Sequence, residues 1–207
     1  MHKKEIAEQC LQRFLTSGIR KMTLQKIVAP LGISTKTVYK YFPDKEALLE
    51  YCLDLHYSRL LKGIEPILNS GSPVVQLFQI WIHATRADFG ASHIFYHDLN
   101  YYYPRLQDKM IRKHARTTSQ PVLEMFEAGI AQGYFRKDLQ PPVVLEGISV
   151  IYTTLTRTDQ FAKYKLAPFT LAANTVEVFL RGICTAKGLA ELETNRELTS
   201  FTAQPQL

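Results

Sequence analysis

The chain has 207 residues, of which 46% are hydrophobic and 21% are charged, a balance typical of a soluble globular protein with ample core. The formal net charge of +6 is unevenly placed: residues 1–62 carry 11 lysines and arginines against 6 acidic residues, and residues 63–207 carry 14 against 13. This distribution of charge indicates two modules: a basic N-terminal module that binds a polyanion such as a nucleic acid, and a nearly neutral module that does not.

The sequence excludes a membrane protein, because no stretch reaches the roughly 18 apolar residues of a membrane span. The N-terminus lacks the apolar run of a signal peptide, so we expect a cytoplasmic protein. The cysteines at positions 10, 52 and 184 are far apart and form no Cys-x-x-Cys pair, which predicts buried free thiols in a reducing compartment.

Residues 3–17 are the first predicted helix, and Gly18 ends it. A second, short helix follows Thr23, a good N-cap, and its apolar residues recur at helical spacing up to Leu31. Gly32 suits the left-handed end of that helix, and Ser34 offers the N-cap of a third. Two short helices joined by a tight turn that contains glycine are typical of a helix-turn-helix. The second helix of this motif enters the DNA major groove.

Pro30 lies late in the second of these helices. Because proline has no backbone N–H, it removes the bond to the carbonyl of Lys26 and should bend or shorten the last turn. Pro43 and Asp44 end the third helix and begin another, predicted over residues 44–63.

The third helix has a polar face opposite Val38 and Phe42. Lysine contacts phosphates or guanine edges, and Thr and Tyr hydroxyls donate to phosphate oxygens. The alternative is an ordinary amphipathic helix with a solvated face. The polar residues are Thr35, Lys36, Thr37, Tyr39 and Lys40.

The string GISTKTVYKYFPDKEALL, with TLQKI upstream, closely resembles the DNA-binding signature of the TetR (tetracycline-repressor-like) family of bacterial transcription regulators. The shared features are the Gly-apolar-Ser turn, the Thr37-Val38-Tyr39 core, Phe42 and the Asp44–Leu48 helix start. Pro30 departs from the family, and the resemblance covers only residues near 5–55.

The resemblance implies roles for eight residues. Thr23 would cap the second helix and donate to phosphate, with Gln25 near a phosphate or the minor groove. Thr35 and Lys36 would read base edges. Thr37 and Tyr39 match the family's phosphate-contacting pair, and either could also reach a base. Lys40 would contact a base or a phosphate, and Lys45 would contact a phosphate at the start of the next helix.

Beyond Pro73 the pattern stays helical, with predicted helices over 73–88, 91–102, 104–132, 141–157 and 168–188 and with Pro121 expected to kink the third of them. We therefore expect an all-α chain: a three-helix DNA-binding head at 1–47, a helical-bundle ligand-binding and dimerisation domain at 48–193, and a polar tail at 194–207.

The last two long helices are apolar around much of their circumference, and a helix apolar on two sides must be buried on two sides. Gly147 and Gly182 permit close approach. The resemblance implies a homodimer through these helices, with two recognition helices about one DNA turn or a multiple of it apart on a palindromic operator. A deep monomeric core is the alternative.

Aromatic and polar rings gather in residues 78–103, and similar proteins bind an inducer in the body. Bundle pockets with a few polar groups bind small ligands, although ordinary core explains the same residues. Our candidate lining is Trp81, Thr85, Phe89, Tyr96, Met110, Phe126 and Tyr152.

Two histidines, His93 and His97, share a helix face, but no third ligand stands at diagnostic spacing, so we expect no metal and no other cofactor. Enzymatic signatures are missing, and we expect no enzyme. The resulting prediction is a repressor released by a small-molecule inducer. An activator, a regulator controlled by a protein partner, or an enzyme or metal-dependent protein with a three-helix head are the alternatives.

Overall fold

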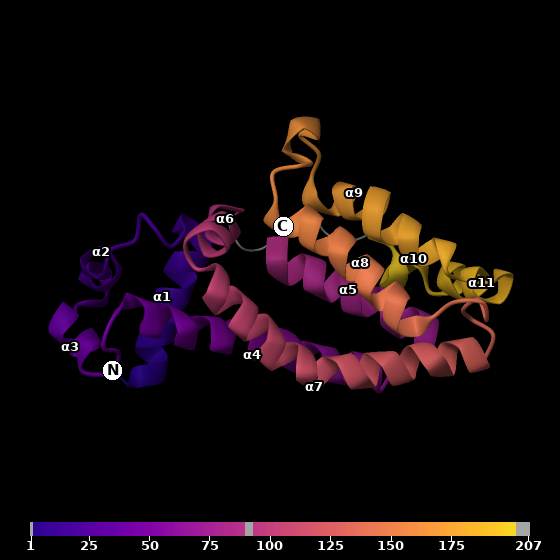
Figure 1. Cartoon of the computed structure of the whole chain (residues 1–207), viewed down its shortest axis with the longest axis horizontal. Coiled ribbons are helices and arrows are strands. Elements are labelled where there is room, and N and C mark those ends of the chain that lie inside the picture. The colour runs from indigo at the N-terminus through magenta and orange to yellow at the C-terminus, as the bar shows by residue number, and fades with distance from the viewer. Residues whose placement is uncertain (1, 90–92, 202–207) are drawn as a thin grey trace. The chain divides into compact units, whose positions relative to one another are not determined.

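The computed structural model describes residues 2–89 and 93–201, without the side chains of residues 93 and 115–118. Apart from one isolated bridge between Phe135 and Cys184, the regular structure in this part of the chain is helical, which confirms the all-α prediction. The chain divides into two compact units (Figure 1): unit 1 is Met1–Leu60 with Gly90–Ala115, and unit 2 is Leu61–Phe89 with Arg116–Leu207.

The N-terminal helices are α1 (Lys3–Ser17), α2 (Leu24–Val28), α3 (Thr35–Tyr39) and α4 (Lys45–Leu68). The central helices are α5 (Pro73–Phe89), α6 (His93–Tyr102), α7 (Pro104–Ala131) and α8 (Pro141–Arg157). The C-terminal helices are α9 (Pro168–Ala172), α10 (Val178–Gly182), α11 (Ala186–Thr194) and α12 (Arg196–Thr199). These units describe packing, so the functional division at residues 47 and 193 stays a prediction.

The helix-turn-helix forms where its capping residues predict. Thr23 Oγ1 accepts the backbone N–H of Lys26 at 3.3 Å, and Ser34 Oγ accepts that of Thr37 at 3.2 Å. Gly32 has a φ of 65°, the left-handed conformation that a side chain would strain. Each expected cap is confirmed.

Pro30 shortens α2, as predicted. The helix ends at Val28, and Ala29–Leu31 continue as a 3₁₀ turn. Without an N–H at Pro30, the α-helical bond to the Lys26 carbonyl cannot form, and the tighter turn replaces it.

Unit 1 has a core in which α1 holds the helix-turn-helix. Phe14 of α1, Ile27 of α2, Val38 of α3 and Leu49 of α4 are all fully buried in one apolar cluster. The five-residue helix α3 is too short to be stable alone, so its orientation depends on this packing.

Two helix ends differ from the predictions. The helix predicted over residues 44–63 is longer than expected, because α4 continues to Leu68 with Pro66 inside it. The helix predicted to run to residue 188 ends at Gly182, after a π-helical segment at Ala173–Glu177. Thr185 then caps α11 by accepting the N–H of Gly188 at 3.1 Å, so this stretch is two helices rather than one.

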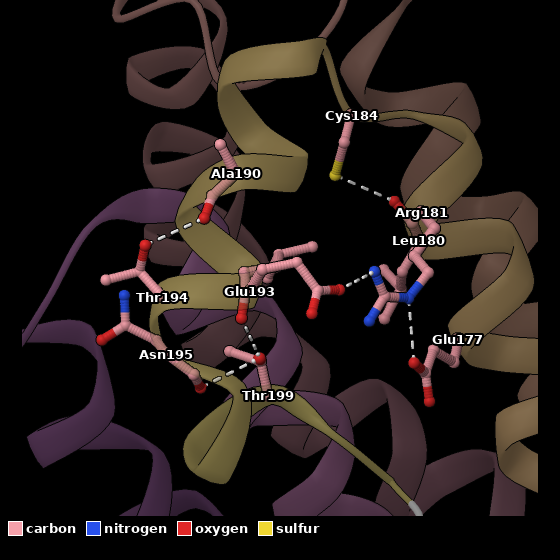
Figure 2. A network of polar contacts seen from close by, with 10 residues as sticks. Glu177, Leu180, Arg181, Cys184, Ala190, Glu193, Thr194, Asn195 and Thr199 are labelled. Atoms are coloured by element: carbon pink, nitrogen blue, oxygen red, sulfur yellow. Dashed lines mark hydrogen bonds and ion pairs between the residues drawn. The ribbon is translucent and has the colours of Figure 1, made fainter.

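Within unit 2, α5, α8 and the α9–α10 stretch pack against one another (Figure 1). Polar contacts tie the C-terminal helices together: Arg181 binds Glu177 at 2.9 Å and Glu193 at 3.2 Å (Figure 2). Within the predicted polar tail at 194–207, the side chain of Phe201 is fully buried. The apolar side chain anchors the chain after α12, a position that a polarity argument overlooks.

Candidate nucleic-acid interface and ligand site

The polar residues of α3 lie on its accessible side. Val38 is fully buried while Tyr39 is 53% exposed, so the short helix turns a single apolar residue inward. An open hollow in the surface runs along the exposed side. Its lining is Ser34, Lys36, Thr37, Tyr39, Lys40 and Tyr41. Four of the side chains expected to meet DNA thus line this hollow, namely Lys36, Thr37, Tyr39 and Lys40. Thr35, in the same helix, is half-buried.

The capping hydroxyls keep a proton for an outside partner. Thr23 Oγ1 accepts a bond from the Lys26 N–H, which leaves its own O–H free to donate outward. Ser34 and Thr37 hydroxyls lie 3.1 Å apart and share one bond, so one of their two protons remains available. Thr23 and Gln25 are both exposed at the start of α2, where backbone N–H groups also favour a phosphate.

The charged side chains of residues 9–43, which include the helix-turn-helix, are all positive. Between Glu8 and Asp44 the sequence has no acidic residue, and residues 9–43 carry six lysines and arginines. This concentration of positive charge covers the loop before α2 and both helices of the motif. It is a stronger electrostatic signal than the charge of the whole N-terminal quarter, and counting charges in shorter windows would have found it.

Lys45 has an intramolecular partner instead of a free ammonium group. Its Nζ donates to the carbonyl of Ile19 at 2.6 Å and lies 5.9 Å from the centre of the Phe14 ring. Burial lowers the pKa of Lys45, and the Asp98 carboxylate counteracts this by raising it. The phosphate contact predicted for Lys45 therefore has a competitor within unit 1.

The candidate ligand residues are divided between the units. Tyr96 and Met110 belong to the core of unit 1, where Tyr96 packs edge-on against Phe95 at 5.1 Å. Trp81 and Tyr152 lie together in unit 2, with ring centres 5.1 Å apart. Phe126 is fully buried and stacked on Phe135, which gives it the surroundings of a core residue.

A buried carboxylate that sequence reasoning missed belongs to the unit 2 cluster. Tyr152 donates its hydroxyl proton to Asp88 Oδ2 at 2.8 Å, and Asp88 is only 5% exposed. Burial, followed by the charge of Asp88, raises the pKa of Tyr152 well above its usual value. Trp81, Thr85 and Asp88 stand at i, i+4 and i+7 on α5, a helical spacing that would have predicted the grouping.

The indole N–H of Trp81 has no hydrogen-bond partner among the described residues, although this nitrogen is buried. The hydroxyl of Thr85 donates to the Trp81 carbonyl at 2.7 Å and accepts no bond from the indole N–H. Buried donors usually have an acceptor, because leaving one unsatisfied costs roughly 1–3 kcal/mol. The cluster therefore combines one unsatisfied donor with a buried carboxylate and two aromatic rings.

Unit 2 exposes an apolar stripe on two neighbouring helical stretches. On α8, Val143 is 69% and Val150 is 57% exposed, and Val178 of α10 is 62% exposed. A Cβ at Gly182 would meet no atom within 4 Å, so this position is open to the outside. Glu146, the one acidic residue in α8, is exposed as well.

The remaining chemistry of the described residues is sparse. They include no group of three or more histidine, cysteine or acidic side chains placed to hold a metal ion. The side chain of His93 lies outside the described residues. In the part of the chain that the structure describes, no helix has the length and apolarity needed to cross a membrane.

Residues 11–52 match the family model of the bacterial regulatory proteins of the tetR family. No curated protein matches the chain. The fold is similar to that of a TetR-family transcriptional regulator from Agrobacterium tumefaciens, at a TM-score of 0.67 and 20% identity over 89% of this chain and 100% of that one.

Two further solved structures are similar over most of their length. One is the fatty acid degradation regulator FadR from Bacillus halodurans, at a TM-score of 0.66 and 18% identity over 86% of this chain and 94% of that one. The other is the ketosteroid transcriptional regulator KstR2 of Mycobacterium tuberculosis, at a TM-score of 0.57 and 19% identity over 88% of this chain and 95% of that one.

Proposed function

We propose that this chain, a DNA-binding regulator with a TetR-family head and the TetR-family regulator fold, represses transcription as a homodimer on a palindromic operator. The observation that carries the proposal is the exposed polar surface of α3, set in a stretch of 35 residues without an acidic side chain. In a helix-turn-helix, the second helix places its N-terminal part against base edges while neighbouring groups bind phosphates.

The proposed contacts follow the accessible groups. Thr35 and Lys36, at the start of α3, read base edges; Thr37, Tyr39 and Lys40 contact phosphates or bases. Thr23 and Gln25, at the start of α2, contact the backbone. Each well-formed base contact contributes about 1–3 kcal/mol of discrimination between sequences.

The exposed stripe on α8 and α10 supports the homodimer. Val143, Val150 and Val178 are large apolar side chains left in water on adjacent helices, and a symmetric partner would cover the same stripe on both copies. A two-fold dimer presents two α3 helices to two half-sites of an inverted repeat.

A small molecule is the proposed signal, bound by the Trp81–Asp88–Tyr152 cluster of unit 2. The unsatisfied indole N–H and the two rings suit a largely apolar molecule that carries a hydrogen-bond acceptor. Two proteins of similar fold are named a fatty acid degradation regulator and a ketosteroid transcriptional regulator, and a largely apolar ligand would fit with these names. Such a ligand lowers operator affinity only by its preference for the state that does not bind DNA.

The direct experiment selects binding sequences from random duplexes with the purified full chain. The proposal expects an enriched inverted repeat. Lys36→Ala should weaken binding to it and either relax one base position or reduce the salt slope by about one. Lys137→Ala is the matched control, because it removes an exposed lysine of unit 2. No enrichment, or equal effects of the two substitutions, would refute the proposal.

Activator and repressor bind DNA alike, so their distinction needs a reporter gene placed behind the selected repeat. Lower expression in cells that contain the protein, restored by a ligand that also releases the duplex, is the result we expect. Raised expression would make the chain an activator. Release of the duplex by a protein alone would replace the small molecule with a protein partner.

A further inference from the structure

We infer that Asp98 of α6 is a positioning residue for DNA binding, because its carboxylate fixes the loop that leads into the helix-turn-helix. This inference rests on the proposed function. The loop comprises residues 18–22, between α1 and Thr23, and it carries Arg20 and Lys21. Asp98 lies outside residues 11–52, the part that matches the family model.

The Asp98 carboxylate makes two bonds to consecutive backbone groups. Its Oδ2 accepts the N–H of Ile19 at 2.8 Å and the N–H of Arg20 at 2.7 Å, and Asp98 is only 5% exposed. Hydrogen bonds to a charged acceptor are about twice as strong as neutral ones, and this acceptor is largely shielded from water. The backbone of the loop is thus held at a defined distance from α6.

Gly18 makes this close approach possible. Its φ of 79° is in the region that favours glycine, and a Cβ there would lie 2.6 Å from Ile94 Cγ2 and 2.9 Å from Asp98 Oδ2. A side chain would push the loop off α6. Position 18 therefore requires glycine for two reasons: the positive φ, and the close contact of the loop with Ile94 and Asp98.

Two further side chains hold the same loop. Lys45 of α4 donates to the Ile19 carbonyl at 2.6 Å, so both polar groups of the Ile19 backbone have side-chain partners. Tyr102 of α6 accepts a bond from Arg20 Nη1 at 2.6 Å, and the guanidinium lies 5.0 Å from the centre of its ring. We call Asp98, Lys45 and Tyr102 the loop clamp.

The loop clamp acts at the place where DNA contacts begin. Residue 22 joins directly to Thr23, the cap of α2, and Arg20 and Lys21 add positive charge beside the proposed phosphate contacts. Because the loop is already ordered in the free protein, DNA binding does not have to offset the entropy lost in ordering it, and the affinity is higher. Asp98, itself negatively charged, therefore promotes binding to a polyanion.

Electrostatics and the loop clamp predict opposite effects on DNA affinity when Asp98 is replaced by a neutral residue, so the substitution distinguishes them. Asp98→Ala removes a negative charge, which by electrostatics alone would strengthen DNA binding. The loop clamp predicts instead a loss of about tenfold or more in affinity for the selected repeat. Asp108→Ala is the matched control, since it removes an exposed carboxylate of the same unit and should leave affinity unchanged or slightly raised. Asp98→Asn keeps an acceptor oxygen but loses the charge that strengthens both bonds, so its affinity should lie between those of wild type and Asp98→Ala. If the alanine variant does not fold, an affinity of Asp98→Asn equal to or above that of wild type would overturn the positioning role.

Hydrogen exchange of residues 18–22 in the free protein supplies a readout that needs no DNA. The loop clamp predicts faster exchange of this segment in Asp98→Ala, with the exchange of α8 unchanged. Unaltered exchange would overturn the loop clamp. Faster exchange with unaltered or tighter DNA binding would overturn the positioning role. If the wild-type chain selects no sequence, the proposed function fails, while the exchange result still decides whether Asp98 holds the loop.

Discussion

Replacing Val150 by Asp should separate the proposed homodimer into single chains. Val150 is 57% exposed on α8, within the stripe that also contains Val143 and Val178. Burying a whole valine side chain contributes at least about 1.5 kcal/mol of free energy, so burying the exposed half of Val150 against a partner would stabilise the dimer by about 1 kcal/mol. A two-fold interface contains the residue twice, which makes about 2 kcal/mol in the dimer.

The introduced carboxylates add a second cost. Burying even a neutral polar group without a partner costs about 1–3 kcal/mol, and a charge costs more. The combined loss of about 4 kcal/mol or more corresponds to about a thousandfold rise in the dimer dissociation constant. Val150→Ala, which introduces no charge, should give a much smaller rise.

Sedimentation velocity over a concentration series measures this directly. Wild type should sediment as a dimer where Val150→Asp sediments as a monomer, with an unchanged circular dichroism spectrum. Leu189→Asp on α11 is the control, because it makes the same kind of change at an exposed residue of another helix in unit 2. If Val150→Asp associates as wild type does, or if the control dissociates equally, α8 is not the interface.

Ser34→Ala removes the cap of α3 and should cost about 1 kcal/mol in urea unfolding, together with weaker DNA binding, whereas unchanged values for both would show that the cap does not hold the helix. Burial alone would raise the pKa of Asp54, but hydrogen bonds from Lys113 and His114 outweigh it and lower the pKa. The stabilisation from Asp54 is therefore present above its unfolded pKa of about 3.9 and is lost as the pH falls through the lower folded value. Thermal unfolding should show Asp54→Asn less stable than wild type at pH 6 but not at pH 2; an equal deficit at both would contradict this pairing. Burial raises the pKa of Cys10 to about 11 and of Cys184 to about 12, and that of Cys52 well above its usual value. Thiol reagents should thus label the native protein slowly and the unfolded protein at three sites, and one fast-reacting thiol in the native state would contradict the burial.

Local signals in the sequence were sufficient for the helix-turn-helix. Thr23, Gly32 and Ser34 act through bonds and dihedral angles within a few residues, so their roles can be predicted without knowing the rest of the fold. The shortening of α2 at Pro30 is equally local. The end of α4 was not predicted correctly: the helix runs past residue 63 and through Pro66, since proline removes one backbone bond and the other turns of the helix persist.

The features that could not be predicted from the sequence depend on contacts between residues far apart in the chain. The bond from Ile19 to Asp98 joins residues 79 positions apart, and the bond from Tyr152 to Asp88 joins residues 64 apart. Helical spacing places Asp88 on one face of α5 with Trp81 and Thr85, but no local pattern around Asp88 or Asp98 distinguishes a buried carboxylate from a solvated one. The candidate ligand set was divided for the same reason, since Tyr96 and Trp81 share a ring-rich stretch of sequence but pack into different units.

The central claim is that this chain recognises DNA sequence through α3 as a dimer. Fluorescence anisotropy with the selected inverted repeat and a scrambled duplex, titrated in salt and at stoichiometric concentrations, tests it most directly. The account predicts two subunits, or a multiple of two, per repeat, affinity that falls steeply with salt, and binding to the repeat roughly a thousandfold or more tighter than to the scrambled duplex. Equal, weak binding to both duplexes, or one subunit per repeat, would contradict it.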